Sequence, residues 1–130
     1  MLLTAESRQQ IFDSIRSVLQ KQCPPMVASK DKEGVYELIG NKAVPYGSKK
    51  EIVPGMYFSS VVARPNMVSF YFFPIYMAHK EFIDIIPTMA KCLKGKSCFN
   101  FKRPEQVNTK ELAAMLKKGV AVWKKQGFMK

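Results

Sequence analysis

Residues 56–73 read MYFSSVVARPNMVSFYFF, and this stretch decides the fold. Its two halves, 56–63 and 67–73, are rich in the aromatic and β-branched residues that favour extended strands. Between the halves, Pro65 and Asn66 are residue types that tight turns prefer. The stretch therefore predicts an antiparallel β-hairpin.

A two-residue turn would fix the register of this hairpin. It would place Ser60 opposite Tyr71, and Ser59 opposite Phe72. Cross-strand neighbours pack side by side, so each face would hold a small hydroxyl beside a large ring. One interpretation is a ligand pocket, for which the candidate binding residues are Tyr57, Ser59, Tyr71 and Phe72. The other is ordinary packing of large against small side chains in the core.

Apolar residues recur at helical spacing at both ends of the chain. The first such stretch covers 4–21, and Thr4 stands where a helix N-cap is expected. The last covers 108–125, where Asn108 followed three positions later by Glu111 matches a capping box. Both stretches predict amphipathic helices.

The middle of the chain contains shorter signals. A helical pattern over 79–93 includes Pro87, which cannot donate a hydrogen bond inside a helix, so we expect two short helices or a kink. Alternating residues over 98–102 and a short apolar run over 35–39 predict strands. The signals over 26–54 are otherwise mixed.

These elements follow the order α-β-β-β-α-β-α and predict a single α+β domain over 1–130. The simplest architecture is a two-layer sandwich, an antiparallel sheet with helices on one face. The run 70–73 is aromatic at every position, so its strand is expected to be apolar on both faces. A loop, a ligand or a second subunit in a homodimer would then cover the face that the helices leave free.

The segment 93–101, LKGKSCFNF, is followed by Pro104 and by the helix that begins near Asn108. Together with the preceding hairpin, this ending resembles the YdhG-like domain family. The resemblance implies the fold more firmly than an activity, because the family is largely of unknown function. Some members are described as frataxin-like iron chaperones, and for that role the hard oxygen ligands available are Glu6 and Asp13. No catalytic residue follows from the resemblance.

Basic side chains are concentrated toward the end of the chain. The protein has 21 Lys and Arg against 10 Asp and Glu, and residues 85–130 alone hold 11 basic and two acidic side chains. Lysines on the last helix are expected to point away from its apolar stripe, and 91–103 could extend this basic surface. The candidate anion-binding residues are Lys117, Lys118, Lys124, Lys125 and Arg103.

Such a surface favours weak, sequence-independent binding of a polyanion that salt weakens. The alternative is a solvated helix face that keeps the protein soluble. Because nearly all of this charge is lysine, bidentate recognition of bases or phosphates is disfavoured.

The chain has no recognisable catalytic motif, cofactor motif or targeting segment. Its three cysteines lack the spacing of a zinc site and fit a reducing compartment, so we expect a cytoplasmic protein without a cofactor. No apolar run is long enough to span a membrane. The sequence predicts a small non-enzymatic binding domain, and a small-molecule enzyme with its site on the hairpin is the alternative.

Overall fold

The computed structural model describes residues 3–130. Its helices are α1 (Ala5–Gln20), α2 (His79–Asp84) and α3 (Thr109–Lys125), with 3₁₀ helices η1 (Phe73–Tyr76), η2 (Met89–Cys92) and η3 (Pro104–Gln106). Its strands are β1 (Val27–Lys32), β2 (Val35–Ile39), β3 (Val44–Tyr46), β4 (Glu51–Val53), β5 (Tyr57–Arg64), β6 (Met67–Phe72), β7 (Leu93–Lys94) and β8 (Cys98–Phe101).

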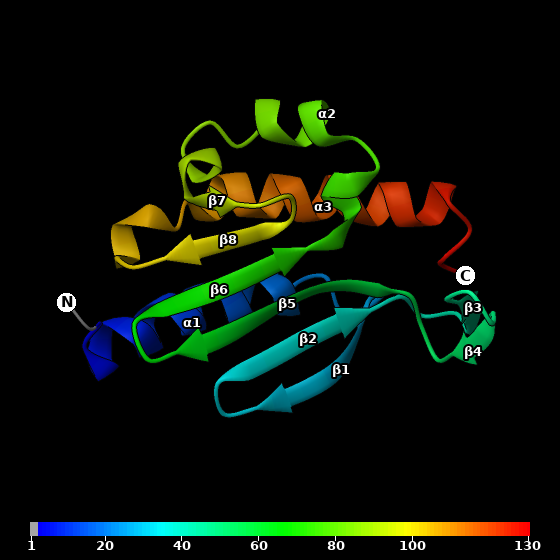
Figure 1. The fold of residues 1–130 in the computed structure, drawn as a ribbon, viewed down its shortest axis with the longest axis horizontal. Coiled ribbons are helices and arrows are strands. Elements are labelled where there is room, and N and C mark those ends of the chain that lie inside the picture. The colour runs from blue at the N-terminus through cyan, green and yellow to red at the C-terminus, as the bar shows by residue number, and fades with distance from the viewer. Residues whose placement is uncertain (1–2) are drawn as a thin grey trace.

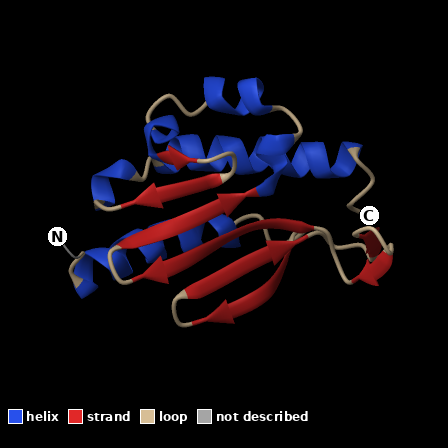
Figure 2. Ribbon diagram, in the orientation of Figure 1, coloured by secondary structure: helices blue, strands red, loops and turns tan. Residues whose placement is uncertain are grey.

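Six strands form one antiparallel sheet in the order β1-β2-β5-β6-β8-β7, and β3 and β4 form a separate hairpin. Helices α1 and α3 lie behind the sheet in Figure 1 and cover one of its faces. Figure 2 shows the same separation of helices from strands into two layers. The predicted two-layer α+β architecture is confirmed.

The β5–β6 hairpin has the predicted register. Arg64 lies opposite Met67 across a two-residue turn, Ser60 lies opposite Tyr71, and Ser59 lies opposite Phe72. The two-residue turn fixes this register, because a shift of one residue would move every buried side chain of the strand to the opposite face.

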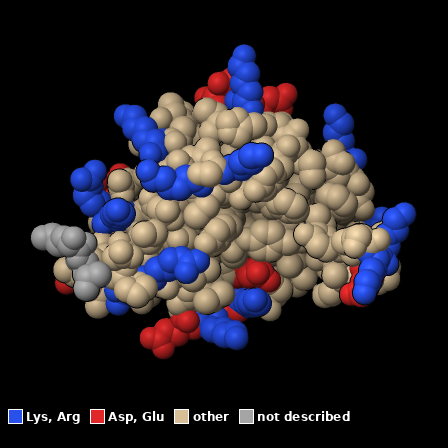
Figure 3. Space-filling model, viewed as in Figure 1, with Lys and Arg blue, Asp and Glu red and all other residues tan. Residues whose placement is uncertain are grey.

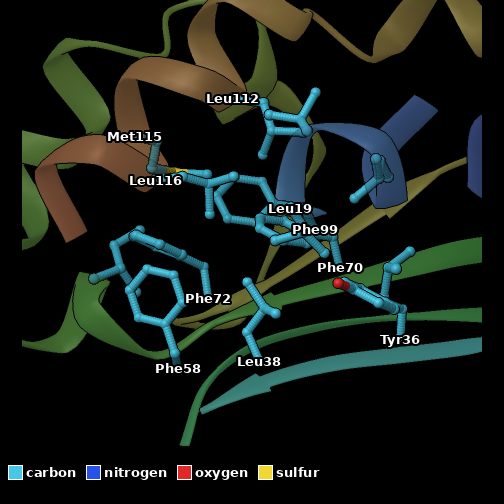
Figure 4. Close-up of a cluster of buried hydrophobic side chains, with 14 of the residues drawn as sticks. Leu19, Tyr36, Leu38, Phe58, Phe70, Phe72, Phe99, Leu112, Met115 and Leu116 are labelled. Carbon is cyan, nitrogen blue, oxygen red and sulfur yellow. The ribbon is translucent and has the colours of Figure 1, made fainter. Parts of the chain in front are cut away.

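The face of the sheet under the helices, here called the inner face, forms the core (Figure 4). Phe70, Phe72 and Phe99 from the sheet are fully buried against apolar side chains of α1 and α3, such as Leu19 and Leu116. This aromatic packing removes a large apolar area from water and holds the two layers together.

A bulge in β5 shifts which residues face the core. Leu38 of β2 pairs with Ser59, and the next residue, Ile39, pairs with Tyr57, so Phe58 has no partner on β2. The extra residue allows Phe58 and Ser59 both to be buried on the inner face, while Tyr57 and Ser60 lie on the other face. The Phe58 ring packs edge-on against Phe72, with ring centroids 5.6 Å apart.

Both terminal helices begin at the predicted caps. The Thr4 side chain accepts from the Ser7 N–H, and the Asn108 side chain accepts from the Glu111 N–H. The Glu111 carboxylate instead accepts from the N–H groups of Thr88 and Met89, so it holds the start of η2 rather than completing the capping box.

Other expectations needed correction. The interrupted helix over 79–93 is the predicted pair of short helices, α2 and η2, but Leu93 belongs to β7. Strands β1, β3, β4 and β7 were not predicted. The strand over 67–73 ends at Phe72, since Phe73 begins η1, and within the run 70–73 only Tyr71 points away from the core.

Candidate ligand-binding face

The helices leave the opposite face of the sheet uncovered, and we call it the outer face. The strand pairing identifies the residues on this face, because residues that lie opposite each other share a face and successive residues of a strand alternate between faces. In the central strands and β8 this face is mostly polar, and it carries Glu37, Tyr57, Ser60, Arg64, Ser69, Tyr71, Cys98 and Asn100. Basic side chains gather over β7 and β8 on the side of the molecule shown in Figure 3.

Arg64 lies at the centre of a hydrogen-bonded network on the outer face. Its guanidinium donates to the Ser69 hydroxyl at 3.1 Å and to the Tyr71 hydroxyl at 2.7 Å. Ser69 in turn donates to the Asn100 side-chain oxygen at 2.9 Å. Within residues 3–130, no carboxylate lies within ion-pair distance of Arg64. The guanidinium is therefore held in place by neutral groups, and its charge remains available to an anion.

A groove at the β8 end of this face adjoins the network through Asn100. Its volume is about 430 Å³, and its lining residues are Met67, Lys91, Cys92, Lys94, Asn100, Lys102 and Gln106. We call it the lysine groove. It has no carboxylate in its lining, and its three ammonium groups form no ion pair within the described part of the chain.

The amide side chains of the lysine groove also present donors. The Gln106 oxygen accepts from the backbone N–H of Lys102 at 2.7 Å and of Arg103 at 2.9 Å. The Asn100 oxygen accepts from Ser69 and Cys98. With both oxygens engaged, the two NH₂ groups are the polar atoms left to meet a ligand.

Cys92 is the cysteine in the lining of the lysine groove. Burial raises the pKa of its thiol, although the charges of Arg103 and Lys94 act in the opposite direction. A raised pKa keeps the sulfur protonated at neutral pH, where a thiol is a poor nucleophile. The groove thus combines three lysines with a protonated thiol, and its lining pairs no activated nucleophile with a base.

The four residues predicted to form a ligand pocket lie on opposite faces. Ser59 and Phe72 are fully buried on the inner face, whereas Tyr57 and Tyr71 are on the outer face. The Ser59 hydroxyl is buried without a hydrogen-bond partner. The large-to-small packing interpretation therefore describes Ser59 and Phe72, and only the two tyrosines remain accessible to a ligand.

Tyr57 is partly buried on the outer face. Its hydroxyl lies 2.6 Å from the Ser60 oxygen, and burial is the main cause that raises the pKa of Tyr57 to about 12. The phenol is therefore neutral at physiological pH and serves as a hydrogen-bonding group, not as a base.

This raised pKa predicts a loss of stability in alkali. Between about pH 10 and pH 12, Tyr57 ionises in the unfolded chain but stays protonated in the folded one, so the free energy of unfolding falls as pH rises. Tyr57→Phe should make this part of the curve less steep in urea unfolding measured at several alkaline pH values. Part of the slope should remain, because burial also raises the pKa of Tyr36 to about 12. Ser60→Ala retains the phenol and should retain the slope. Parallel curves for Tyr57→Phe and the unmodified protein would contradict the prediction.

The predicted anion-binding residues of the last helix form a separate surface. Because α3 packs on the inner face, its exposed lysines point away from the sheet. Lys118 forms an ion pair with Glu81 at 3.4 Å, and Arg103 pairs with Glu105 at 3.3 Å. Lys117, Lys124 and Lys125 are exposed, and the last two lie in the final turn of α3, where positive charge stabilises the helix end.

The weak metal candidates, Glu6 and Asp13, are both exposed on α1. Asp13 accepts a hydrogen bond from the Gln9 amide at 2.7 Å. Among residues 3–130, the structure brings together no group of three or more His, Cys, Asp and Glu side chains that could hold a metal ion.

Sequence reasoning missed Arg64 as a site residue and gave the lysine groove only as an extension of the helical surface. The sequence did contain a signal for part of the lysine groove. Strict alternation over 98–102 places Cys98, Asn100 and Lys102 on the face opposite Phe99 and Phe101. The contribution of Arg64 required the strand order, which places β5, β6 and β8 side by side.

A scan against protein-family models, a search of curated proteins and a search of solved structures each found no match to this chain. The resemblance to YdhG-like domains therefore remains a prediction. Across residues 3–130, no helix has both the length and the apolar character needed to cross a membrane.

Proposed function

We propose that this protein is a small binding domain that holds a multiply charged anion on the outer face of its sheet. The observation that carries the proposal is the lysine groove, in which Lys91, Lys94 and Lys102 converge without a carboxylate in the lining. Arg64, which hydrogen-bonds only to neutral side chains, extends the positive surface on the same face.

The donors favour a ligand rich in anionic oxygens, such as a polyphosphate. Lysine ammonium groups act as compact point charges, so they attract anions without imposing the planar geometry that an arginine fork requires. The amides of Asn100 and Gln106 add hydrogen bonds that a phosphate oxygen can accept. Binding of this kind weakens as salt rises.

The groove supports binding better than catalysis. Its thiol is kept protonated by burial, and none of its lining residues is an acid or a histidine that could act as a general base. The proposal thus retains a non-enzymatic domain with a basic face but moves that face from α3 to the sheet. Cytoplasmic location belongs to the same proposal, because all three cysteines are free thiols.

A homodimer through the outer face stays a prediction. It has less support than the sequence suggested, because the outer face is less apolar than expected. Of the aromatic run 70–73, only Tyr71 is on this face, and its hydroxyl is bound to Arg64. A partner subunit would therefore meet a mostly polar surface over the central strands, whereas stable homodimer interfaces are more apolar.

The test is a titration with inorganic tripolyphosphate followed by the amide signals of β7 and β8. Lys94→Gln with Lys102→Gln should weaken binding about fivefold, since two exposed charge contacts contribute roughly 1 kcal/mol together. The matched control, Lys117→Gln with Lys124→Gln, removes the same charge from α3 and should leave the affinity within about twofold. A larger loss in the α3 pair than in the groove pair would place the anion site on the helix and overturn the proposal.

A further inference from the structure

A second hollow lies at the other end of the outer face, beside the β3–β4 hairpin. Its volume is about 280 Å³, and its lining residues are Ser29, Glu37, Ile39, Tyr46, Val53, Pro54, Gly55 and Tyr57. We call it the hairpin pocket. It shares no residue with the lysine groove, and its chemistry is different.

The walls of the hairpin pocket are mainly apolar and aromatic. Ile39, Val53 and Pro54 supply aliphatic surface, and Tyr46 and Tyr57 supply two rings. Tyr46 is 48% exposed, so much of its ring is accessible to a ligand in the pocket. A ligand with an apolar body would cover this ring.

Glu37 is the only charged residue in the lining. One of its carboxylate oxygens accepts from the Ser29 hydroxyl at 2.6 Å, which fixes the carboxylate at the pocket wall. Lys30 lies opposite Glu37 on β1, yet no ion pair between them, or between Glu37 and any other described cation, falls within 4.0 Å. The carboxylate therefore keeps capacity for a positively charged partner.

From this combination we infer that the hairpin pocket binds a small organic ammonium ion, such as a trimethylammonium compound. A carboxylate gives the charge complementarity, and tyrosine rings attract an ammonium group through their π faces. A bare metal ion would need several oxygen ligands, whereas this pocket offers one carboxylate among apolar walls. An anion would be repelled by Glu37.

The pocket size fits this class of ligand. A volume of about 280 Å³ lies just below the usual range of small-molecule sites, so it suits a compact ammonium head with a short chain better than a large cofactor. The site is independent of the lysine groove, so failure of tripolyphosphate binding would leave it unaffected.

Choline is the probe, and the neutral alcohol in which carbon replaces the choline nitrogen is its uncharged isostere. Binding is followed by the amide signals of Ile39, Gly55 and Tyr57 at constant ionic strength. We expect choline to bind with a millimolar dissociation constant. The isostere should bind at least about fivefold more weakly, because it lacks the charge. Equal binding of the two compounds, or no shift of these amides with choline, would overturn the inference.

Variants test the two recognition elements separately. Glu37→Gln keeps the shape of the side chain and its bond to Ser29 while removing the charge, so choline affinity should fall about fivefold. Tyr46→Leu keeps an apolar wall but removes the ring, and a loss of about threefold is expected. Glu33→Gln, which changes the net charge equally outside the pocket, should leave affinity unchanged. If Glu37→Gln binds choline as tightly as the unmodified protein, the amide shifts have another cause and the proposed site is excluded.

Discussion

Phe72→Ala is expected to lower the free energy of unfolding by about 3–5 kcal/mol. The Phe72 side chain is fully buried and packs edge-on against Phe82, with ring centroids 5.1 Å apart, and against Phe58 at 5.6 Å. Its removal would leave a cavity between the sheet and the helices that these rings cannot fill, because each has its own neighbours. Urea unfolding followed by circular dichroism and by the fluorescence of Trp123 measures the loss.

The matched control is Tyr46→Ala, which removes an aromatic side chain from an exposed position on the β3–β4 hairpin. It should change the free energy of unfolding by no more than about 0.5 kcal/mol. A loss below about 1 kcal/mol for Phe72→Ala would show that Phe72 is not a core residue and would return it to the candidate ligand pocket.

The hairpin was predictable in detail because its information is local. Pro65 and Asn66 set a two-residue turn, and the turn fixes every pair across β5 and β6. The pairing of Ser59 with Phe72 followed directly. Whether that pair was a pocket or core packing did not follow, because the answer depends on which face the helices cover.

The strands that were not predicted are those whose sequences lack a regular alternation of buried apolar and exposed polar residues. All six residues of β1 are exposed, so no alternation of apolar and polar residues marks this edge strand. Strands β3 and β4 contain three residues each and therefore offer too few positions for a period of two. The bulge at Phe58 also shifts the phase of β5, so alternation across the whole strand would assign Tyr57 to the wrong face.

Neither of the two proposed sites could be predicted as a whole from the sequence. The lysine groove joins residues of β6, η2, β7, β8 and η3, and the hairpin pocket joins β1, β2 and β5 with the β3–β4 hairpin. Residue types were visible in the sequence, but their convergence depends on strand order. The surplus of lysine toward the end of the chain predicted an anionic partner, and that stays a prediction. The charge was assigned to the last helix because the periodicity of that helix was the clearest.

Gly119→Ala is expected to lower the free energy of unfolding by about 2 kcal/mol, against the usual preference of helices for alanine. Gly119 lies within α3 where the helix crosses the sheet. A Cβ atom there would be 2.7 Å from the Phe72 ring and 3.0 Å from the Phe58 ring. Both rings are fully buried and cannot move without disturbing their neighbours. Chemical denaturation gives the magnitude, and a gain in stability would contradict the predicted clash.

The clash can be separated from helix propensity by two further variants. Ala121→Gly, at an exposed position of the same helix, reports propensity alone and should cost about 1 kcal/mol. Phe72→Leu shortens the side chain that meets the new methyl group, so Gly119→Ala should cost about 1 kcal/mol less in the Phe72→Leu background than alone. Strictly additive losses would show that the cost arises elsewhere. A smaller loss in the Phe72→Leu background would mean that the close contact between Gly119 and Phe72 sets the distance of α3 from the sheet.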